Sequence, residues 1–191
     1  SGQPDNGGVG SLKVRVTATD LAGASVDQLL SLEVLNTNDA PATGVVIEMQ
    51  QAFEDATFTC VLPVGAFADA DVGDHLSFSA TLTNGDMLPS WLNLDAATGT
   101  FSGTPSNGDV GDLRICITAT DQIGAAASQT FGLVVGNTND TPSVAVLLAD
   151  QQATEDAYFT FTLSDGTFQD VDAGDALTLS ATRTDGSILP S

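Results

Sequence analysis

The sequence repeats itself at an interval of 101 residues, and the alignment needs no gap. Residues 1–41 match residues 102–142 at 22 of 41 positions, and residues 54–90 recur as residues 155–191. A period near a hundred residues indicates a row of similar domains rather than a solenoid of short units. We therefore expect a complete repeat at residues 42–142. Residues 1–41 would be the C-terminal part of a preceding repeat, and residues 143–191 the N-terminal part of the next.

The two flanking parts together contain almost a whole further repeat. They lack only the equivalent of the segment WLNLDAATGTF at residues 91–101. Half of a sandwich exposes sheet edges and an apolar face, so we expect a neighbour to complete each part. The expected partner is a neighbouring copy or repeat, arranged head to tail. The sequence leaves open whether the neighbours are separate chains or one longer chain, although the absence of a Met before Ser1 favours a segment of a longer protein.

Short stretches of alternating apolar and polar residues lie between turn signals along the chain, which is typical of a β-sandwich. Helical patterns with capping residues are absent. The predicted fold class is therefore all-β, with immunoglobulin/cadherin-like sandwich repeats in tandem. Seven strands are expected in the complete repeat, the number in an immunoglobulin-like domain. They span residues 44–49, 57–62, 76–82, 91–94, 100–102, 112–120 and 128–135.

The charge is strongly one-sided, with 25 acidic residues against four basic ones and a formal net charge of −21. All but four of the acids are Asp, which favours turns and loops, where its short carboxylate binds backbone groups or a metal ion. This charge argues against a nucleic acid or an anionic membrane as partner, because both require a basic patch. We find no apolar run long enough to cross a bilayer and no signal peptide.

Two acidic motifs recur at fixed offsets. Asp69 and Asp71 lie two residues apart, so their carboxylates share one side of an extended segment, and Gly73 then allows a turn. The stretch NTNDTP at residues 137–142 is rich in side-chain oxygens and ends in a proline. Calcium takes six to eight oxygen ligands, which both motifs supply. We therefore predict Ca²⁺ sites; the alternative is that these residues only form structural turns.

The motifs NTNDAP and NTNDTP, FEDATF followed by FADADVGD, and ITATDQIG resemble the cadherin repeat. The stretch LPSWLNLDAATGTFSGTP resembles the dystroglycan-type, cadherin-like repeats of bacterial surface proteins. This resemblance implies sandwich domains that bind calcium at their junctions. The linker opens with Asn where cadherins have Asp, and the acidic triplet in the middle of the cadherin domain has no match. Fewer ions at each junction are therefore expected.

The resemblance also implies a set of calcium ligands. At the first junction they are Asn36, Asn38, Asp39, Asp69, Asp71 and Asp121. At the second junction they are Glu54, Asn137, Asn139, Asp140, Asp170 and Asp172. If neighbouring copies complete the partial repeats, Asp20 would join Asp170 and Asp172, and Glu155 would join Asn36 and Asp39.

The remaining candidates for chemistry favour structural roles. His75 is the only histidine and does not recur, so no catalytic constellation can be assembled and we expect no enzyme activity. Cys60 is expected to point inward and Cys116 outward, which argues against a disulfide between them. Trp91 lies in an apolar strand and is expected in the core; the alternative is a surface position suited to stacking on sugar.

Two functions from different classes follow. The first is an extracellular, calcium-stiffened structural or adhesive rod at the cell surface, or a filament that neighbouring copies build through their incomplete ends. The second is a calcium-dependent carbohydrate-binding module, whose partner would be a glycan. Most of the nine Phe fall at inward positions of expected strands, and the chain has one Trp and one Tyr. Few aromatic side chains are thus left to bind sugar, which favours the rod.

Overall fold

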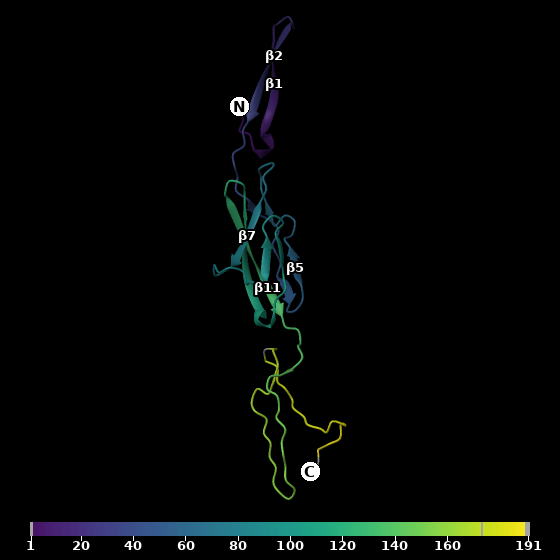
Figure 1. Cartoon of the computed structure of the whole chain (residues 1–191). Coiled ribbons are helices and arrows are strands. Elements are labelled where there is room, and N and C mark those ends of the chain that lie inside the picture. The colour runs from purple at the N-terminus through teal and green to yellow at the C-terminus, as the bar shows by residue number, and fades with distance from the viewer. Residues whose placement is uncertain (1, 173, 190–191) are drawn as a thin grey trace.

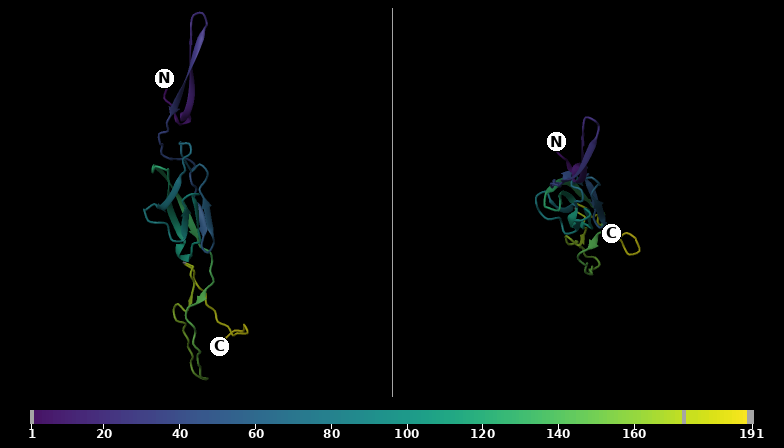
Figure 2. Two further views of the ribbon diagram at one scale, coloured as in Figure 1. Left: turned by 45° about the horizontal axis from the view of Figure 1, so that its top comes forward. Right: turned by 90° about the horizontal axis from the view of Figure 1, so that it is seen from above.

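A computed structural model describes residues 2–172 and 174–189. It shows three parts in a row, in the order of the sequence (Figure 1). A long hairpin lies at the N-terminal end, a sandwich in the middle, and a largely irregular segment at the C-terminal end. The left view of Figure 2 shows the same elongated arrangement, and the right view, seen from above, shows the three parts overlapping. The two partial repeats therefore lie at opposite ends of the central sandwich and do not complete each other within one chain.

The described residues form strands and two short 3-10 turns, which confirms the all-β fold class. The turns are η1 (Asn6–Gly8) and η2 (Asn107–Asp109). The strands are β1 (Gly10–Thr19), β2 (Ser25–Val34), β3 (Ala42–Thr43), β4 (Gln50–Phe53), β5 (Phe58–Val61), β6 (Phe67–Ala68), β7 (Ser77–Leu82), β8 (Leu92–Asp95), β9 (Thr100–Gly103), β10 (Gly111–Thr120), β11 (Ala126–Gly136), β12 (Ser143–Val144) and β13 (Phe168–Gln169).

The central sandwich has two main sheets. One contains four strands in the order β4-β11-β10-β7, and the other contains three in the order β5-β9-β8. Strands β3 and β6 form a separate short pair. All neighbours are antiparallel except β4, which runs parallel to β11. Six of the seven expected strands are confirmed, each within two residues of its predicted ends.

The strand expected at residues 44–49 is wrong. This stretch connects β3, which pairs with β6, to β4, which pairs with β11, so the chain changes sheets here. Gly44 and Val45 donate backbone hydrogen bonds to Ala66 and Gly65. A side chain at Gly44 could not fit, because its Cβ would lie 2.3 Å from the carbonyl oxygen of Gly65. The apolar pattern instead reflects the burial of Ile47 between the sheets.

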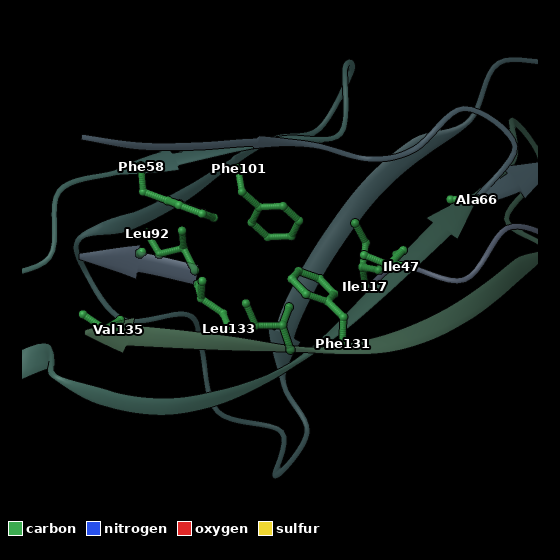
Figure 3. Packing of buried hydrophobic residues seen from close by; sticks show 11 residues of the cluster. Ile47, Phe58, Ala66, Leu92, Phe101, Ile117, Phe131, Leu133 and Val135 are labelled. Atoms are coloured by element: carbon green, nitrogen blue, oxygen red, sulfur yellow. The ribbon is translucent and has the colours of Figure 1, made fainter. Parts of the chain in front are cut away.

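The core lies between the two sheets (Figure 3). Ile115 and Ile117 on β10 and Leu133 on β11 are fully buried against Phe101 on β9. The rings of Phe101 and Phe131 meet edge to face, with centroids 5.5 Å apart, a geometry that aromatic pairs favour. The alternating apolar side chains of β10 and β11 therefore pack against the other sheet and form the core of the sandwich.

The hairpin β1–β2 copies the central hairpin β10–β11 at the 101-residue offset. Gly10 pairs with Val34 as Gly111 pairs with Val135. The burial differs, because no second sheet among the described residues covers the N-terminal hairpin. Val16 is 53% exposed, whereas its equivalent Ile117 is fully buried.

The C-terminal segment keeps only the short pair β12–β13, in which Val144 faces Phe168 as Thr43 faces Phe67. The rest of this segment carries no strand among the residues that the structure describes. Its apolar side chains line an open hollow of about 700 Å³. Both partial repeats thus expose the faces that the complete repeat buries.

The cysteines and the tryptophan take the expected positions. Both thiols are free, and burial raises the pKa of Cys60, which packs against the core. Trp91 is half-buried and meets Phe58 edge to face, with ring centroids 6.4 Å apart. Trp91 therefore belongs to the core packing rather than to an open aromatic surface. No helix in residues 2–172 and 174–189 is long and apolar enough to cross a membrane.

Candidate metal centre

The second junction brings together acids from three successive parts of the chain. Glu54 follows β4, Asp140 lies in the linker after β11, and Asp172 follows β13. One carboxylate oxygen from each lies within 4.8 Å of the other two. Glu54 is 1% exposed, and its Oε1 accepts a hydrogen bond of 2.8 Å from the backbone N–H of Thr138. Its Oε2 is buried and has no hydrogen-bond partner among the described residues.

Asp172 is 7% exposed and resembles Glu54 in its bonding. Its Oδ2 accepts a bond of 2.8 Å from the backbone N–H of Asp140, while its Oδ1 is buried without a partner in the described chain. Burying an unpaired carboxylate oxygen is costly unless a cation or donor balances it. With Asp170 Oδ2, which is also buried without a described partner, the junction holds three unbalanced oxygens of the kind that bind a metal ion.

At the first junction, the linker makes corresponding contacts with acids of the complete repeat that follows it. The backbone N–H of Asp39 donates to Asp71 Oδ2 at 2.8 Å, as Asp140 donates to Asp172. The side-chain amide of Asn38 donates to Asp121 Oδ2 at 2.9 Å, which ties the linker to the end of β10. Asp69 Oδ2 and Asp71 Oδ1 are buried without described partners. The two linkers thus make the same backbone contact with the acidic motif that follows them. They differ in the other acid nearby, which is Asp121 at the first junction and Glu54 at the second.

The linkers are also anchored to the repeat that precedes them. The side-chain amide of Asn6 in η1 donates to Asp39 Oδ2 at 2.7 Å. Its equivalent Asn107 in η2 donates to Asp140 Oδ2 at 2.6 Å. In each linker one aspartate therefore bonds to the preceding repeat through its side chain and to the following acidic motif through its backbone.

Local sequence explains how each acid is held. Asp69 Oδ1 accepts the backbone N–H of Asp71, which makes a tight turn at the motif. Asp121 Oδ1 accepts three backbone N–H groups in the turn between β10 and β11. The Asn38 amide and these backbone donors lower the pKa of Asp121, so it is a stable anion.

Few positive charges lie near these acids. Within the described residues, the one ion pair joins Arg15 to Asp27 on the N-terminal hairpin. Partial burial, together with the nearby carboxylates of Asp69, Asp121 and Asp71, raises the pKa of Asp74. A bound cation would relieve this repulsion.

The predicted ligands divide into those that the structure brings into the acidic clusters and those that it does not. It gathers Glu54, Asp140 and Asp172 in one cluster, Asp69 with Asp121 in a second, and Asp170 with Asp172 in a third. Asn38, Asp39 and Asp71 bond directly to these groups. Asn36 and Asn137 are exposed, and Asn139 is exposed and bonds to the carbonyl of Asp140.

Asp20 and Glu155 are exposed in this chain. Asp20 caps its own turn by accepting the N–H groups of Ala22 and Ala24, as Asp121 does in the central repeat. Their predicted pairing with ligands of a neighbouring copy stays a prediction.

Two cluster members were not predicted: Asp74 joins Asp69 and Asp121, and Asp175 joins Asp170 and Asp172. The signal was present, because both motifs carry a third Asp three residues after the second, in DADVGD and DVDAGD. The donor set fits calcium, since every gathered group is a carboxylate or an amide, and nitrogen or sulfur ligands are not needed.

Comparison with known proteins agrees with this architecture. The family model He_PIG, described as "Putative Ig domain", matches residues 40–136. No curated protein sequence matches the chain.

Among solved structures, the chain resembles the EC3-6 cis-dimer structure of protocadherin gammaB7, with 21% identity and a TM-score of 0.57 over 76% of this chain and 37% of that one. It also resembles mouse clustered PcdhgC3 EC1-3, with 23% identity and a TM-score of 0.52 over 66% of this chain and 43% of that one. The chain thus spans less than half the length of these structures, and at such identities the likeness concerns the fold alone. Both findings agree with the sandwich described above, and the chain belongs to the He_PIG family of Ig-like domains.

Proposed function

We propose that this chain is part of an extracellular structural or adhesive rod, in which calcium at each junction fixes neighbouring sandwich repeats relative to each other. The observation that carries the proposal is the cluster of Glu54, Asp140 and Asp172. It joins a complete repeat, a linker and the following repeat through three carboxylates, and those of Glu54 and Asp172 each have a buried oxygen without a partner among the described residues. An ion held there would bind all three parts at once.

The physical effect of the ion would be on the linker. Without a cation, the clustered carboxylates repel one another and favour separation of the repeats. A ligand that binds only the ordered junction stabilises it by mass action, by about 2.7 kcal/mol when its concentration is a hundred times the Kd. The rod would therefore be stiff in calcium-rich surroundings and flexible without calcium. This dependence favours an extracellular location, because calcium-binding modules of moderate affinity work at the high calcium levels found there.

The proposed partners are neighbouring copies or repeats in a head-to-tail row. In the complete repeat, the hairpin β10–β11 packs against Phe58 of the facing sheet, and its strand β10 pairs with β7, which carries Phe78. The C-terminal segment exposes the equivalent residues, Phe159 and Leu179, and the hairpin β1–β2 exposes a matching apolar face. A hairpin of the β1–β2 type would cover the C-terminal segment in the same register.

We further propose that the segment has no catalytic role. Its clustered carboxylates include ones that accept backbone N–H groups and the side-chain amides of Asn38 and Asn107, and the single histidine lies at the surface. The dystroglycan-type bacterial origin suggested by the sequence belongs to the same proposal. Glycan binding has less support, because Trp91 packs against Phe58 instead of forming an open platform.

Chelation tests the proposal directly. The chain is measured with calcium and with EDTA, by thermal unfolding and by small-angle scattering. Calcium is expected to raise the melting temperature of the chain. In the scattering measurement, it is expected to narrow the range of maximum dimensions that the chain adopts. Magnesium at the same concentration is the control, because its small octahedral shell is harder to satisfy with a cluster of this kind. Unchanged unfolding and unchanged scattering on chelation would exclude the calcium-stiffened rod.

A further inference from the structure

The hairpin β1–β2 and the open hollow of the C-terminal segment lie at opposite ends of the chain (Figure 1). We infer that a second copy of this chain places its hairpin in that hollow, as the two middle strands of a four-stranded sheet, and that Gln28 sets the register of the contact. The inference rests on the proposed head-to-tail row and specifies how two copies meet within it.

The hairpin has one apolar face and one polar face. Every second residue of a strand points to the same side, and on one side these residues are mostly apolar. Four of them are between 42% and 53% exposed: Leu12, Val16, Leu30 and Leu32. The opposite side carries Arg15 and Thr17, which both bond to Asp27. A two-stranded ribbon of this kind is suited to burial on its apolar face and to contact with water on the other.

The hollow is lined by equivalents of the residues that surround the hairpin in the complete repeat. Its lining includes Leu148, Phe159, Phe161, Phe168 and Leu179. The equivalents at the 101-residue offset are Ile47, Phe58, Cys60, Phe67 and Phe78, which belong to the central core or pack against it. There they share the core with Ile117 and Leu133, which correspond to Val16 and Leu32 of the hairpin. The complete repeat therefore shows which element this set of side chains encloses.

The complete repeat also gives the strand pairing. Its hairpin lies between β4, which runs parallel to β11, and β7, which runs antiparallel to β10. At the same offset, β2 would lie beside residues 151–154 and β1 beside residues 178–183. Neither stretch forms a strand in the described chain. Because strands that are distant in sequence pair only when both are present, the C-terminal segment gains these two strands when a hairpin lies between them.

A polar contact fixes the register. In the complete repeat, the side-chain amide of Gln129 on β11 donates to the carbonyl of Ala66 at 2.6 Å. Its equivalent Gln28 is exposed on β2, and the matching carbonyl belongs to Thr167. The carbonyls of Ala66 and Thr167 each accept a backbone N–H at 2.9 Å, so both are held in the same way. A slip of one residue would turn the apolar face outward, and a slip of two would bury Gln28 without a partner.

The occupant is a second copy rather than the chain's own hairpin, because the central sandwich separates the two ends of one chain (Figure 1). The contact joins unlike surfaces of the two copies, so it repeats along an open row. It completes the four-stranded sheet, but the two partial repeats lack the equivalents of residues 91–101. The facing sheet is then supplied mainly by residues 159–162. The composite is therefore less stable than the complete repeat, and we expect assembly that reverses on dilution.

Cysteine cross-linking of the full chain tests the register. Thr118 and Ser79 are paired across β10 and β7, and their equivalents Thr17 and Ser180 belong to different copies in the inferred contact. Paired strands place such Cα atoms about 4.5–5.5 Å apart, which a disulfide can span. A chain with Thr17→Cys and Ser180→Cys should form disulfide-linked dimers and longer multiples in air, in EDTA as well as in calcium. The control pair, Ser31→Cys with Ser180→Cys, should not, because Ser31 lies on the other strand of the hairpin.

Mass mapping of the linked peptides distinguishes the engineered disulfide from any that Cys60 or Cys116 forms. A second measurement, sedimentation of the full chain, tests the polar contact. Gln28→Ala should weaken association roughly tenfold, because a carbonyl buried in the contact loses its donor. Gln129→Ala makes the same change in the complete repeat. It should lower the melting temperature of the central sandwich and leave association unchanged.

The outcomes separate this inference from the proposed function. A chain that stays monomeric at every concentration overturns the inference, and so does a disulfide between the two positions of one copy or equal cross-linking of the control pair. The calcium-stiffened rod is judged by the response to chelation. An interchain disulfide in a chain that does not respond to calcium would support the hairpin contact and exclude that rod. A calcium response in a chain that never associates would have the reverse meaning.

Discussion

The complete repeat and the C-terminal segment carry matching sequence but keep different levels of structure. Their turns agree closely. Leu82 N–H donates to the carbonyl of Asp86 at 2.8 Å, and the equivalent bond from Arg183 to Ser187 measures 2.9 Å. Asp55 and Asp156 both take a positive φ, of 57° and 60°. Structure that depends on neighbours in sequence is therefore the same in both.

The strands between these turns differ. Residues 58–61 form β5, which pairs with β9, whereas the equivalent residues 159–162 form no strand. Phe58 is 8% exposed and Phe159 is 50% exposed. The hairpin β1–β2 shows the converse, because its two strands are adjacent in sequence and keep their full ladder. Two strands that are close in sequence pair on their own, whereas strands that are distant in sequence pair only when both are present.

The largest expected effect comes from truncating the same aromatic residue in the two regions. Phe58→Ala should lower the free energy of unfolding of the central repeat by about 3–5 kcal/mol, since it empties a packed core position. Phe159→Ala should change it by less than about 0.5 kcal/mol. Urea unfolding followed by the fluorescence of Trp91, which packs against Phe58, reports on the central repeat alone. Equal effects of the two variants would contradict the comparison.

A smaller, calcium-dependent effect distinguishes the two junctions. Asp71→Ala should weaken calcium binding at the first junction and Asp172→Ala at the second, because each removes a buried carboxylate. The backbone N–H groups of Asp39 and Asp140 donate to these carboxylates, so their NMR signals report on each junction separately. We expect each variant to abolish the calcium response of one signal and retain the other. If either variant abolished the calcium response of both N–H signals, the two junctions would not be independent.

The smallest effect concerns pH and a turn within the central repeat. The backbone N–H groups of Ala97 and Thr98 bond to Asp95 and lower its pKa below the ordinary value of about 3.9. For a lowered pKa, the stabilisation is complete above that ordinary value and is lost as the pH falls through the folded-state value. Asp95→Asn should therefore flatten the fall in melting temperature of the central repeat below about pH 4.

Asp185→Asn is the control for this measurement. The pKa of Asp185 is also lowered, by bonds from the side chain and backbone of Ser187, but Asp185 lies in the C-terminal segment. Its replacement should leave the Trp91 unfolding curve unchanged at every pH. An identical acid response in the unchanged chain and in Asp95→Asn would show that Asp95 does not contribute.

Much of the candidate site could be predicted from the sequence, because the acids recur at a fixed offset. The pairs Asp69 with Asp71 and Asp170 with Asp172 were identified in this way, and the structure brings them to the linkers. Asp74 was missed, since only its turn brings it back to Asp69. Asn36 and Asn137 were included by resemblance, but both are exposed.

The period, the all-β class, the turns and the acids at each linker could be predicted from the amino-acid sequence, because these depend on composition and on residues near one another. The sequence also specifies the ladders of the two long hairpins, whose strands are neighbours. The crossing of residues 44–49 between the sheets follows from the three-dimensional fold, since β3 and β4 pair with β6 and β11, which are distant in the sequence. The fold likewise sets which apolar faces are buried, because Phe58 is covered by strands far along the chain and Phe159 has none among the described residues.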